Sequence, residues 1–115
     1  MRDNDGLSVE VKPIADGYIL TPTGDVDLAS SPVLRTEIAE LQRRTPRRLV
    51  IDLSGVTYMD SSGVATLLEA MQIARKRGCR LVLCAIQPKV RAIFEIARLD
   101  MVFTIVDSTE AALTA

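Results

Sequence analysis

An aspartate, two serines and a glycine stand together at residues 60–63, directly after an apolar run and directly before an amphipathic one. A serine hydroxyl before a helix accepts a hydrogen bond from a backbone N–H and so caps the helix. The same hydroxyl on an exposed loop is also accessible to a kinase. The two roles can be divided between Ser61 and Ser62, and the residue types alone leave open whether either serine is phosphorylated.

Three carboxylates, those of Asp25, Asp27 and Asp60, are further candidates for chemistry. Such groups can provide acid and base catalysis or hold a divalent cation. We favour the interpretation that they cap helices and turns, because neither a glycine-rich phosphate loop nor a further ligand cluster accompanies them. The chain also lacks histidine, the commonest general base and metal ligand. We therefore expect a protein that is not an enzyme and has no catalytic residue, metal or cofactor.

The hydrophobic patterns predict strands that alternate with helices. A hairpin is expected to pair residues 7–12 with 18–21 across the Asp16-Gly17 turn, with further strands at 47–53, 79–86 and 101–106. Helices are expected from Ser30 or Ser31 to near Arg44, over 64–77, from Pro88 onward, and after Ser108. The second helix has a clear apolar stripe, formed by Val64, Leu67, Leu68, Met71 and Ala74.

This alternation predicts an α/β fold with a mixed, mostly parallel β-sheet, packed α-helices and an N-terminal β-hairpin. We expect one domain over residues 1–115, in which three apolar residues of the second helix pack on two central strands. These residues are Leu67, Leu68 and Met71, and the strand residues are Val50, Ile51, Val82 and Leu83. Loops that leave the carboxyl ends of strands gather at one pole of such a sheet. Residues 23–27, 54–62 and 85–88 are predicted to meet there, so residues 60–63 lie at the pole where sites are built.

Charge and hydropathy narrow the classes of partner. The net charge of -1 and the pI of about 5.4 provide no general attraction to nucleic acid or to an anionic membrane. No segment resembles a signal peptide, and no apolar run approaches the roughly 20 residues of a membrane span. We expect a cytoplasmic protein that binds neither nucleic acid nor membrane and is monomeric when free.

Basic residues and cysteines have local explanations. Eight cations form two groups at predicted helix ends, namely Arg43, Arg44, Arg47 and Arg48, and Arg75, Lys76, Arg77 and Arg80. We interpret both groups as complements of the helix dipole rather than as a phosphate-binding or lipid-binding patch. Cys79 and Cys84 are expected on opposite faces of a strand, about 16 Å apart at about 3.3 Å per residue. They are therefore expected to be unpaired thiols packed in the interior.

The segments "VIDLSGVTYMDSSGV" and "GCRLVLCAIQPKVRAIFEIARLDMVFTIVDSTEAAL" together resemble a bacterial anti-sigma-factor antagonist, a protein made of a STAS domain. The resemblance extends upstream through "LTPTGDVDLASSPVLRTEI" and so covers nearly the whole chain. It implies a small protein that binds an anti-sigma factor with serine kinase activity and thereby releases a sigma factor. It also implies that serine phosphorylation switches the antagonist off and that a PP2C-type phosphatase switches it back on.

The resemblance also implies roles for particular residues. The phosphoacceptor in the family is the hydroxyl residue directly after the aspartate, which here is Ser61, and Ser62 would then be the nearer cap of the helix. The implied partner-binding residues are Gly24, Asp25, Asp27, Met59, Asp60, Ser61, Ser62 and Gly63. The chain departs from the frequent family pattern at residues 64–65, which are Val-Ala in place of Leu-Gly.

Two other readings remain open at this point. The chain could be a STAS accessory subunit that is not phosphorylated and docks on another complex, such as a lipid-transport ATPase. Weak nucleotide binding at the same pole is also conceivable, because helix N-termini favour anions, although no glycine-rich cradle supports it. The identity of the partner discriminates the accessory subunit from the phosphorylation switch.

Overall fold

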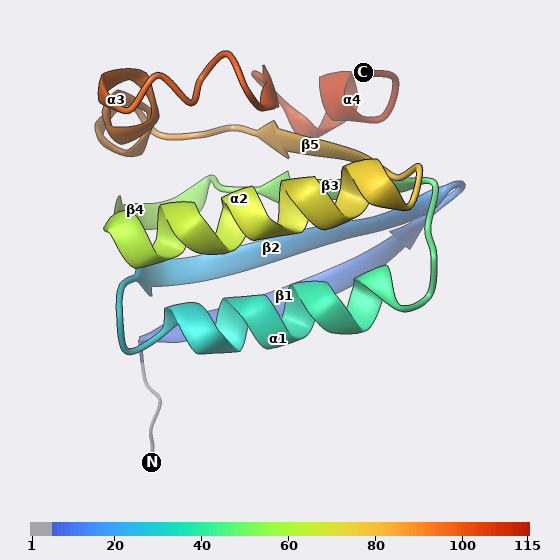
Figure 1. Cartoon of the computed structure of the whole chain (residues 1–115), viewed down its shortest axis with the longest axis horizontal. Helices are drawn as coiled ribbons and strands as arrows, with labels where there is room; N and C mark the ends of the chain where they lie inside the picture. Colours follow the sequence, from blue (N-terminus) through green and yellow to red (C-terminus); the bar gives the residue numbers. More distant parts are fainter. Residues whose placement is uncertain (1–5) are drawn as a thin grey trace.

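The computed structural model describes residues 6–115, in which six strands form one mixed sheet with helices on both of its faces (Figure 1). The strands are β1 (Leu7–Ile14), β2 (Gly17–Val26), β3 (Arg48–Asp52), β4 (Gly55–Met59), β5 (Arg80–Cys84) and β6 (Thr104–Val106). The helices are α1 (Ser31–Gln42), α2 (Ser61–Lys76), α3 (Pro88–Ile96) and α4 (Thr109–Ala112). The predicted α/β class is confirmed.

The strand pairing also follows the prediction. β1 and β2 form an antiparallel hairpin, and the other paired strands are parallel, in the order β1-β2-β3-β5-β6. β4 lies off this path, because β3 pairs with residues 17–20 of β2 whereas β4 pairs with residues 23–26. Pro22 lies between these two stretches. It has no N–H to donate to a ladder, so it fits the position where β2 changes partner.

β4 corrects the prediction that residues 54–62 form a loop. Ser54 and Gly55 have the composition of a turn, and the strand that follows lacks regular alternation. The register shifts between Gly24 and Asp25, and Thr57 is passed over in the pairing. Both Thr57 and Tyr58 are consequently exposed. The same pairing shows that residues 23–26, expected in a loop, complete β2.

The two faces of the sheet are covered by different helices. α1 and α2 lie side by side on one face and begin at the same end of the sheet (Figure 1). Leu67 and Met71 of α2 belong to the same core cluster as Ile51 and Leu83, as predicted. The prediction is wrong for the other two strand residues, because successive strand side chains point to opposite faces. Val50 and Val82 pack instead with Ala112 of α4, and Leu68 is only partly buried.

The helix boundaries agree closely with the sequence, with one informative exception. α1 ends at Gln42, α3 begins at Pro88, and the Ser108 hydroxyl caps α4 by accepting a hydrogen bond from the Ala111 N–H at 3.1 Å. α2, however, begins at Ser61, before its apolar stripe. Residues 101–103, predicted as strand, precede β6 in turns and bends.

The two cysteines lie on opposite sides of the sheet and are both free, as predicted. Cys79 packs against the core beneath α1 and α2, and Cys84 belongs to the cluster beneath α4. Within residues 6–115, the helices lack the length and apolar character that crossing a membrane requires.

Candidate functional site

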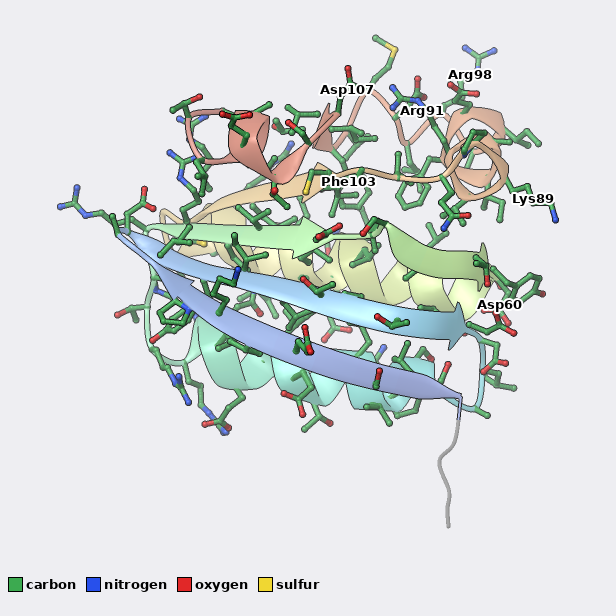
Figure 2. All side chains as sticks on the ribbon, turned by 180° about the vertical axis from the view of Figure 1, so that it is seen from behind. Asp60, Lys89, Arg91, Arg98, Phe103 and Asp107 are labelled. Carbon is green, nitrogen blue, oxygen red and sulfur yellow. The ribbon has the colours of Figure 1, made fainter. Side chains whose placement is uncertain are left out.

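The ends of β2 and β4 bring the predicted site residues together. Val26 and Met59 are paired at the last position of this parallel ladder, and the Asp60 N–H donates to the Val26 carbonyl oxygen at 3.1 Å. Asp27 and Asp60 therefore leave the sheet side by side, at the end that Asp60 marks in Figure 2. We call this region the carboxyl pole and define it by residues 25–30 and 57–62. The third predicted loop meets the second at the end away from Asp60, because Gln87 Nε2 donates to the Ser54 carbonyl oxygen at 2.7 Å, just before β4 begins.

Asp60 is the residue that caps α2. Its Oδ1 accepts hydrogen bonds from the Ser62 N–H at 2.9 Å, the Gly63 N–H at 3.4 Å and the Ser62 hydroxyl at 2.6 Å. The prediction that Ser62 caps the helix is wrong, because the aspartate before it already occupies the free N–H groups. The hydrogen bond from the Ser62 hydroxyl lowers the pKa of Asp60, helped by the backbone N–H groups and opposed by partial desolvation.

Asp60 thereby distinguishes the two serines. The Ser62 hydroxyl is partly buried and held by the Asp60 carboxylate, and it is not free to meet a reactant. Ser61 is exposed as the first residue of α2, and within residues 6–115 its hydroxyl makes no hydrogen bond. The carboxyl pole therefore presents one free hydroxyl at a helix N-terminus.

The loop from β2 to α1 has a fixed shape. The buried Ser30 donates its hydroxyl to the Asp25 carbonyl oxygen at 2.7 Å and accepts from the Asp27 N–H at 2.9 Å. Asp27 Oδ1 in turn accepts from the N–H groups of Ala29 and Ser30 at 3.1 and 3.0 Å. Ser30 occupies the predicted N-cap position, but its side chain closes the loop instead of capping α1.

Asp25 and Gly24 lie at the irregular end of β2. Thr57 donates its hydroxyl to Asp25 Oδ1 at 3.2 Å, which links β4 to β2 on the exposed surface. Gly24 has a φ of 122°, and a Cβ there would lie 1.9 Å from the Gly6 carbonyl oxygen. A glycine is needed at this position for conformation and for close approach. Its role at the pole is to shape the strand that carries Asp25.

Two of the predicted partner-binding residues are not at the surface. Met59 is 1% exposed, and Gly63 is buried where the first turn of α2 crosses the ends of the strands. A Cβ on Gly63 would lie 2.7 Å from atoms of both Met59 and Val26. The implied contact of Met59 and Gly63 with a partner stays a prediction, and their burial gives these two residues a structural role in the free domain. These residues let α2 approach the sheet closely, and they position Ser61 without being accessible themselves.

Two exposed apolar side chains at the pole were missed by the sequence analysis. Leu28 is 78% exposed at the tip of the β2–α1 loop, and Tyr58 is 50% exposed at the end of β4. Leu28 follows Asp27 in the short segment between β2 and the Ser30-Ser31-Pro32 start of α1, and an apolar side chain in such a loop was the available signal. Exposed apolar groups beside fixed polar groups are typical of protein interfaces.

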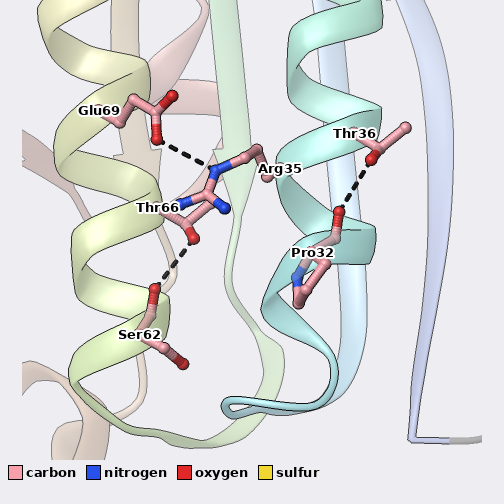
Figure 3. Close-up of polar contacts among 6 residues, drawn as sticks. All are labelled: Pro32, Arg35, Thr36, Ser62, Thr66 and Glu69. Carbon is pink, nitrogen blue, oxygen red and sulfur yellow. Dashed lines mark hydrogen bonds and ion pairs between the residues drawn. The ribbon is translucent and has the colours of Figure 1, made fainter.

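The helices behind the pole are tied to each other. Arg35 of α1 pairs with Glu69 of α2 at 3.1 Å, and Thr66 donates its hydroxyl to the Ser62 carbonyl oxygen at 2.9 Å (Figure 3). Thr36 makes the equivalent bond to Pro32 at 2.9 Å in α1. The first turns of both helices thus form a stiff base for the loop and for Ser61.

The polar side chains at the carboxyl pole are carboxylates and hydroxyls that accept or donate hydrogen bonds. Among the residues that the structure describes, no three metal-ligating side chains come together, and the chain has no histidine. Asp27 and Asp60 accept hydrogen bonds from backbone N–H groups, in keeping with the interpretation that these carboxylates cap turns and helices. The pole offers an acidic surface with the exposed side chains of Leu28 and Tyr58 and one free serine hydroxyl, that of Ser61.

Comparison with proteins of known sequence shows that the chain is similar to proteins named as anti-sigma factor antagonists. BtrV of Bordetella bronchiseptica is 38% identical over 93 residues, which cover 80% of this chain and 79% of BtrV. The anti-sigma F factor antagonist of Paenibacillus polymyxa is 27% identical over 109 residues, covering 94% of this chain and 93% of that protein.

Comparison with solved structures supports the fold. An anti-sigma factor antagonist from Mycobacterium paratuberculosis has a TM-score of 0.88 at 24% identity, over 99% of this chain and 97% of that one. The Bacillus cell fate determinant SpoIIAA, solved in a phosphorylated form, has a TM-score of 0.70 at 19% identity, over 90% and 96% of the two chains. The STAS domain family matches residues 8–112, and the chain belongs to that family.

Proposed function

We propose that this protein is an anti-sigma-factor antagonist that binds an anti-sigma factor through its carboxyl pole and is switched off by phosphorylation of Ser61. The observation that carries the proposal is the difference between the two serines, since the Ser62 hydroxyl is held by Asp60 and the Ser61 hydroxyl is free and exposed. The names of the relatives support the first part. The existence of a phosphorylated form of SpoIIAA supports the second.

A phosphate on Ser61 is compatible with the fold. It adds about -1.5 to -2 charges at neutral pH, and the dipole of α2 favours an anion at the N-terminus, although the Asp60 carboxylate already accepts from the Ser62 and Gly63 N–H groups. Asp60 holds the first turn of α2 through its hydrogen bonds, and Ser61 is exposed on that turn. A phosphate on Ser61 would therefore lie on the surface of the domain. The domain should remain folded after modification.

The same phosphate should weaken binding of the partner. Asp25, Asp27 and Asp60 already make the pole acidic, and Leu28 and Tyr58 add apolar contacts. The anti-sigma factor should therefore present a basic rim around an apolar recess. A bulky dianion at Ser61 would have to lose its hydration within such an interface, which costs more than neighbouring cations return. The anti-sigma factor itself, as a serine kinase, would supply the phosphate, and a PP2C-type phosphatase would remove it.

The experiment begins with the partner. Copurification from the native cell followed by mass spectrometry should recover a serine kinase that binds a sigma factor. Incubation of the protein with that kinase and ATP should add one phosphate, which fragment-ion analysis should place on Ser61. Ser61→Ala should abolish the modification and keep partner binding, whereas Ser62→Ala should still be modified. A phosphate on Ser62 alone would contradict the assignment.

The same experiment tests the accessory-subunit alternative. Recovery of a membrane transporter such as a lipid-transport ATPase, with Ser61 unmodified in the cell, would favour that reading. The proposal further places the protein in the cytoplasm as a monomeric binding module without catalytic activity of its own. Sedimentation at micromolar concentration should give a single species of 12.6 kDa.

A further inference from the structure

A groove of about 740 Å³ lies at the end of the sheet opposite the carboxyl pole. It is framed by the last turn of α2, the beginnings of β3 and β5, the β1–β2 turn and the start of β6. Its lining consists of Asp16, Arg47, Arg48, Met71, Ala74, Arg75, Gly78, Cys79, Arg80, Leu81, Val102 and Thr104. α2, with 16 residues, separates it from Ser61 by about 24 Å at 1.5 Å per residue.

Several basic residues near this end have a structural partner. Arg48 pairs with Asp16 at 3.0 Å and donates to the Ala112 and Ala115 carbonyl oxygens at 3.0 and 2.7 Å. Arg77 donates to the Gln42 carbonyl oxygen at the end of α1, and Arg44 lies over the Tyr18 ring. These contacts stabilise the packing of α1, β3 and the C-terminal residues.

Three arginines of the groove differ from these. Arg47 and Arg80 are exposed, and within residues 6–115 their side chains make neither an ion pair nor a hydrogen bond. Arg75 makes only a long contact to the Val102 carbonyl oxygen at 3.3 Å. The helix dipole accounts for Arg75, which lies in the last turn of α2, but not for Arg47 and Arg80, which lie at or before the beginnings of strands. The predicted dipole explanation is thus wrong for these two residues.

The floor of the groove is apolar. Met71, Ala74 and Leu81 are between 2% and 7% exposed and form its base, with Val102 beside them. Four arginines face a single carboxylate there, although the whole chain has a net charge of -1. Guanidinium groups match phosphate oxygens in pairs, and apolar floors bind the carbon skeleton of a ligand.

We propose that this groove binds an organic phosphate, with the phosphate held by Arg47, Arg75 and Arg80 and the apolar part of the molecule on Met71, Leu81 and Val102. Its volume is within the range of small-molecule sites. The ligand could be a free phosphorylated metabolite or the headgroup region of a phospholipid, since both combine these chemical features. The site is independent of the phosphorylation switch, because it shares no residue with the carboxyl pole.

Cys79 provides a direct readout of occupancy. Its side chain lines the groove and is partly exposed, whereas Cys84 is fully buried. Alkylation of the folded protein should therefore label Cys79 alone, slowly, because burial raises the pKa of its thiol. With 1-naphthyl phosphate as the probe, the labelling rate should fall with saturation by at least about fivefold, since a bound ligand covers the thiol. Inorganic phosphate should protect Cys79 more weakly, because it has no apolar part to contact the floor of the groove.

The test compares two variants with the same change in charge. Arg47→Gln with Arg80→Gln should weaken protection by about tenfold or more, because charge-assisted hydrogen bonds to the phosphate are lost. Lys89→Gln with Arg98→Gln, two exposed cations of α3 and the turn after it, should leave protection unchanged. Continued resistance of Cys84 to alkylation verifies that both variants are folded. Absence of protection at millimolar probe, equal protection by inorganic phosphate, or equal loss in both variants would overturn the proposal.

A second arm identifies the source of the ligand. If the wild-type protein sediments with phosphatidylglycerol vesicles and the Arg47→Gln, Arg80→Gln variant does not, the ligand is a lipid headgroup. Protection by soluble 1-naphthyl phosphate without binding to vesicles assigns a free metabolite. Phosphorylation of Ser61 by its kinase should be unchanged in the groove variant, so the two proposals fail separately.

Discussion

At the carboxyl ends of β2 and β4, short acidic and hydroxyl side chains are bonded to the backbone of their own loops. At the beginnings of β3 and β5, long arginine side chains surround an apolar floor, and two of them have no partner within residues 6–115. The surface of the carboxyl pole is held in one conformation, because Asp27, Ser30 and Asp60 each accept or donate several hydrogen bonds there. A fixed surface suits a protein partner that must detect one changed group.

The groove at the other end is built differently. Its free cations are long and can rearrange around a small anion, and its buried floor gives the ligand an apolar contact. The comparison teaches that the two ends of one helix can carry surfaces of different chemistry in one small domain. α2 carries Ser61 in its first turn and Arg75 in its last.

The largest effect should follow from disturbing that shared helix. Leu67→Ala removes a side chain that is 0% exposed beneath the middle of α2 and should lower the free energy of unfolding by about 2 to 5 kcal/mol. Both ends of the sheet should be affected. Leu68→Ala is the matched control, because Leu68 is only partly buried, and it should cost less. Urea denaturation measures both, and equal midpoints would show that the helix packs in another register.

α2 also shows how far the sequence determines the structure. Its apolar stripe repeats at helical spacing, so its core residues were predictable from local pattern alone. β4 was not, because its pairing with residues 23–26 is distant in the chain and the register shift next to Gly24 removes its alternation. The residue types alone left open whether either serine of residues 60–63 is phosphorylated, and only the family resemblance implied Ser61. In the structure the Asp60 carboxylate separates the two hydroxyls, because it caps α2 locally and accepts a hydrogen bond from the Ser62 hydroxyl.

The groove was beyond sequence analysis for a similar reason. Arg47, Arg75 and Arg80 come from three different elements, and nothing in the local sequence distinguishes them from Arg48, whose charge is paired. From the sequence alone, an interaction with the helix dipole was enough to explain these arginines, because they lie near predicted helix ends. α1 ends at Gln42 and has no basic residue in its last turn.

A smaller effect should separate the two ends. Ser30→Ala removes a buried hydroxyl and leaves the Asp25 carbonyl oxygen and the Asp27 N–H, which lie in a partly exposed loop, without their partner, and should cost about 0.5 to 1.5 kcal/mol. Phosphorylation of Ser61 and partner binding should slow, whereas protection of Cys79 in the groove should not change. Ser108→Ala removes an exposed cap from α4 and serves as the control, with stability reduced but kinase kinetics preserved. A loss of groove binding in Ser30→Ala would show that the ends are coupled.

The smallest effect concerns pH and again only the carboxyl pole. The Ser62 hydroxyl and the backbone N–H groups hold the pKa of Asp60 below its ordinary value. A carboxylate with a lowered pKa in the folded state stabilises the protein above its unfolded pKa of about 3.9, and this contribution disappears as the pH falls through the folded value. Asp60→Asn keeps an acceptor oxygen but cannot titrate at this position. The difference in the midpoint of urea denaturation between the wild type and Asp60→Asn should therefore be larger at neutral pH than in acid.

Ser62→Ala, which removes the largest cause of the lowered pKa, should show a smaller loss of stability between neutral pH and acid than the wild type. A constant difference for Asp60→Asn across this range would mean that the Asp60 charge contributes nothing to holding the first turn of α2, and the fixed surface around Ser61 would then need another support.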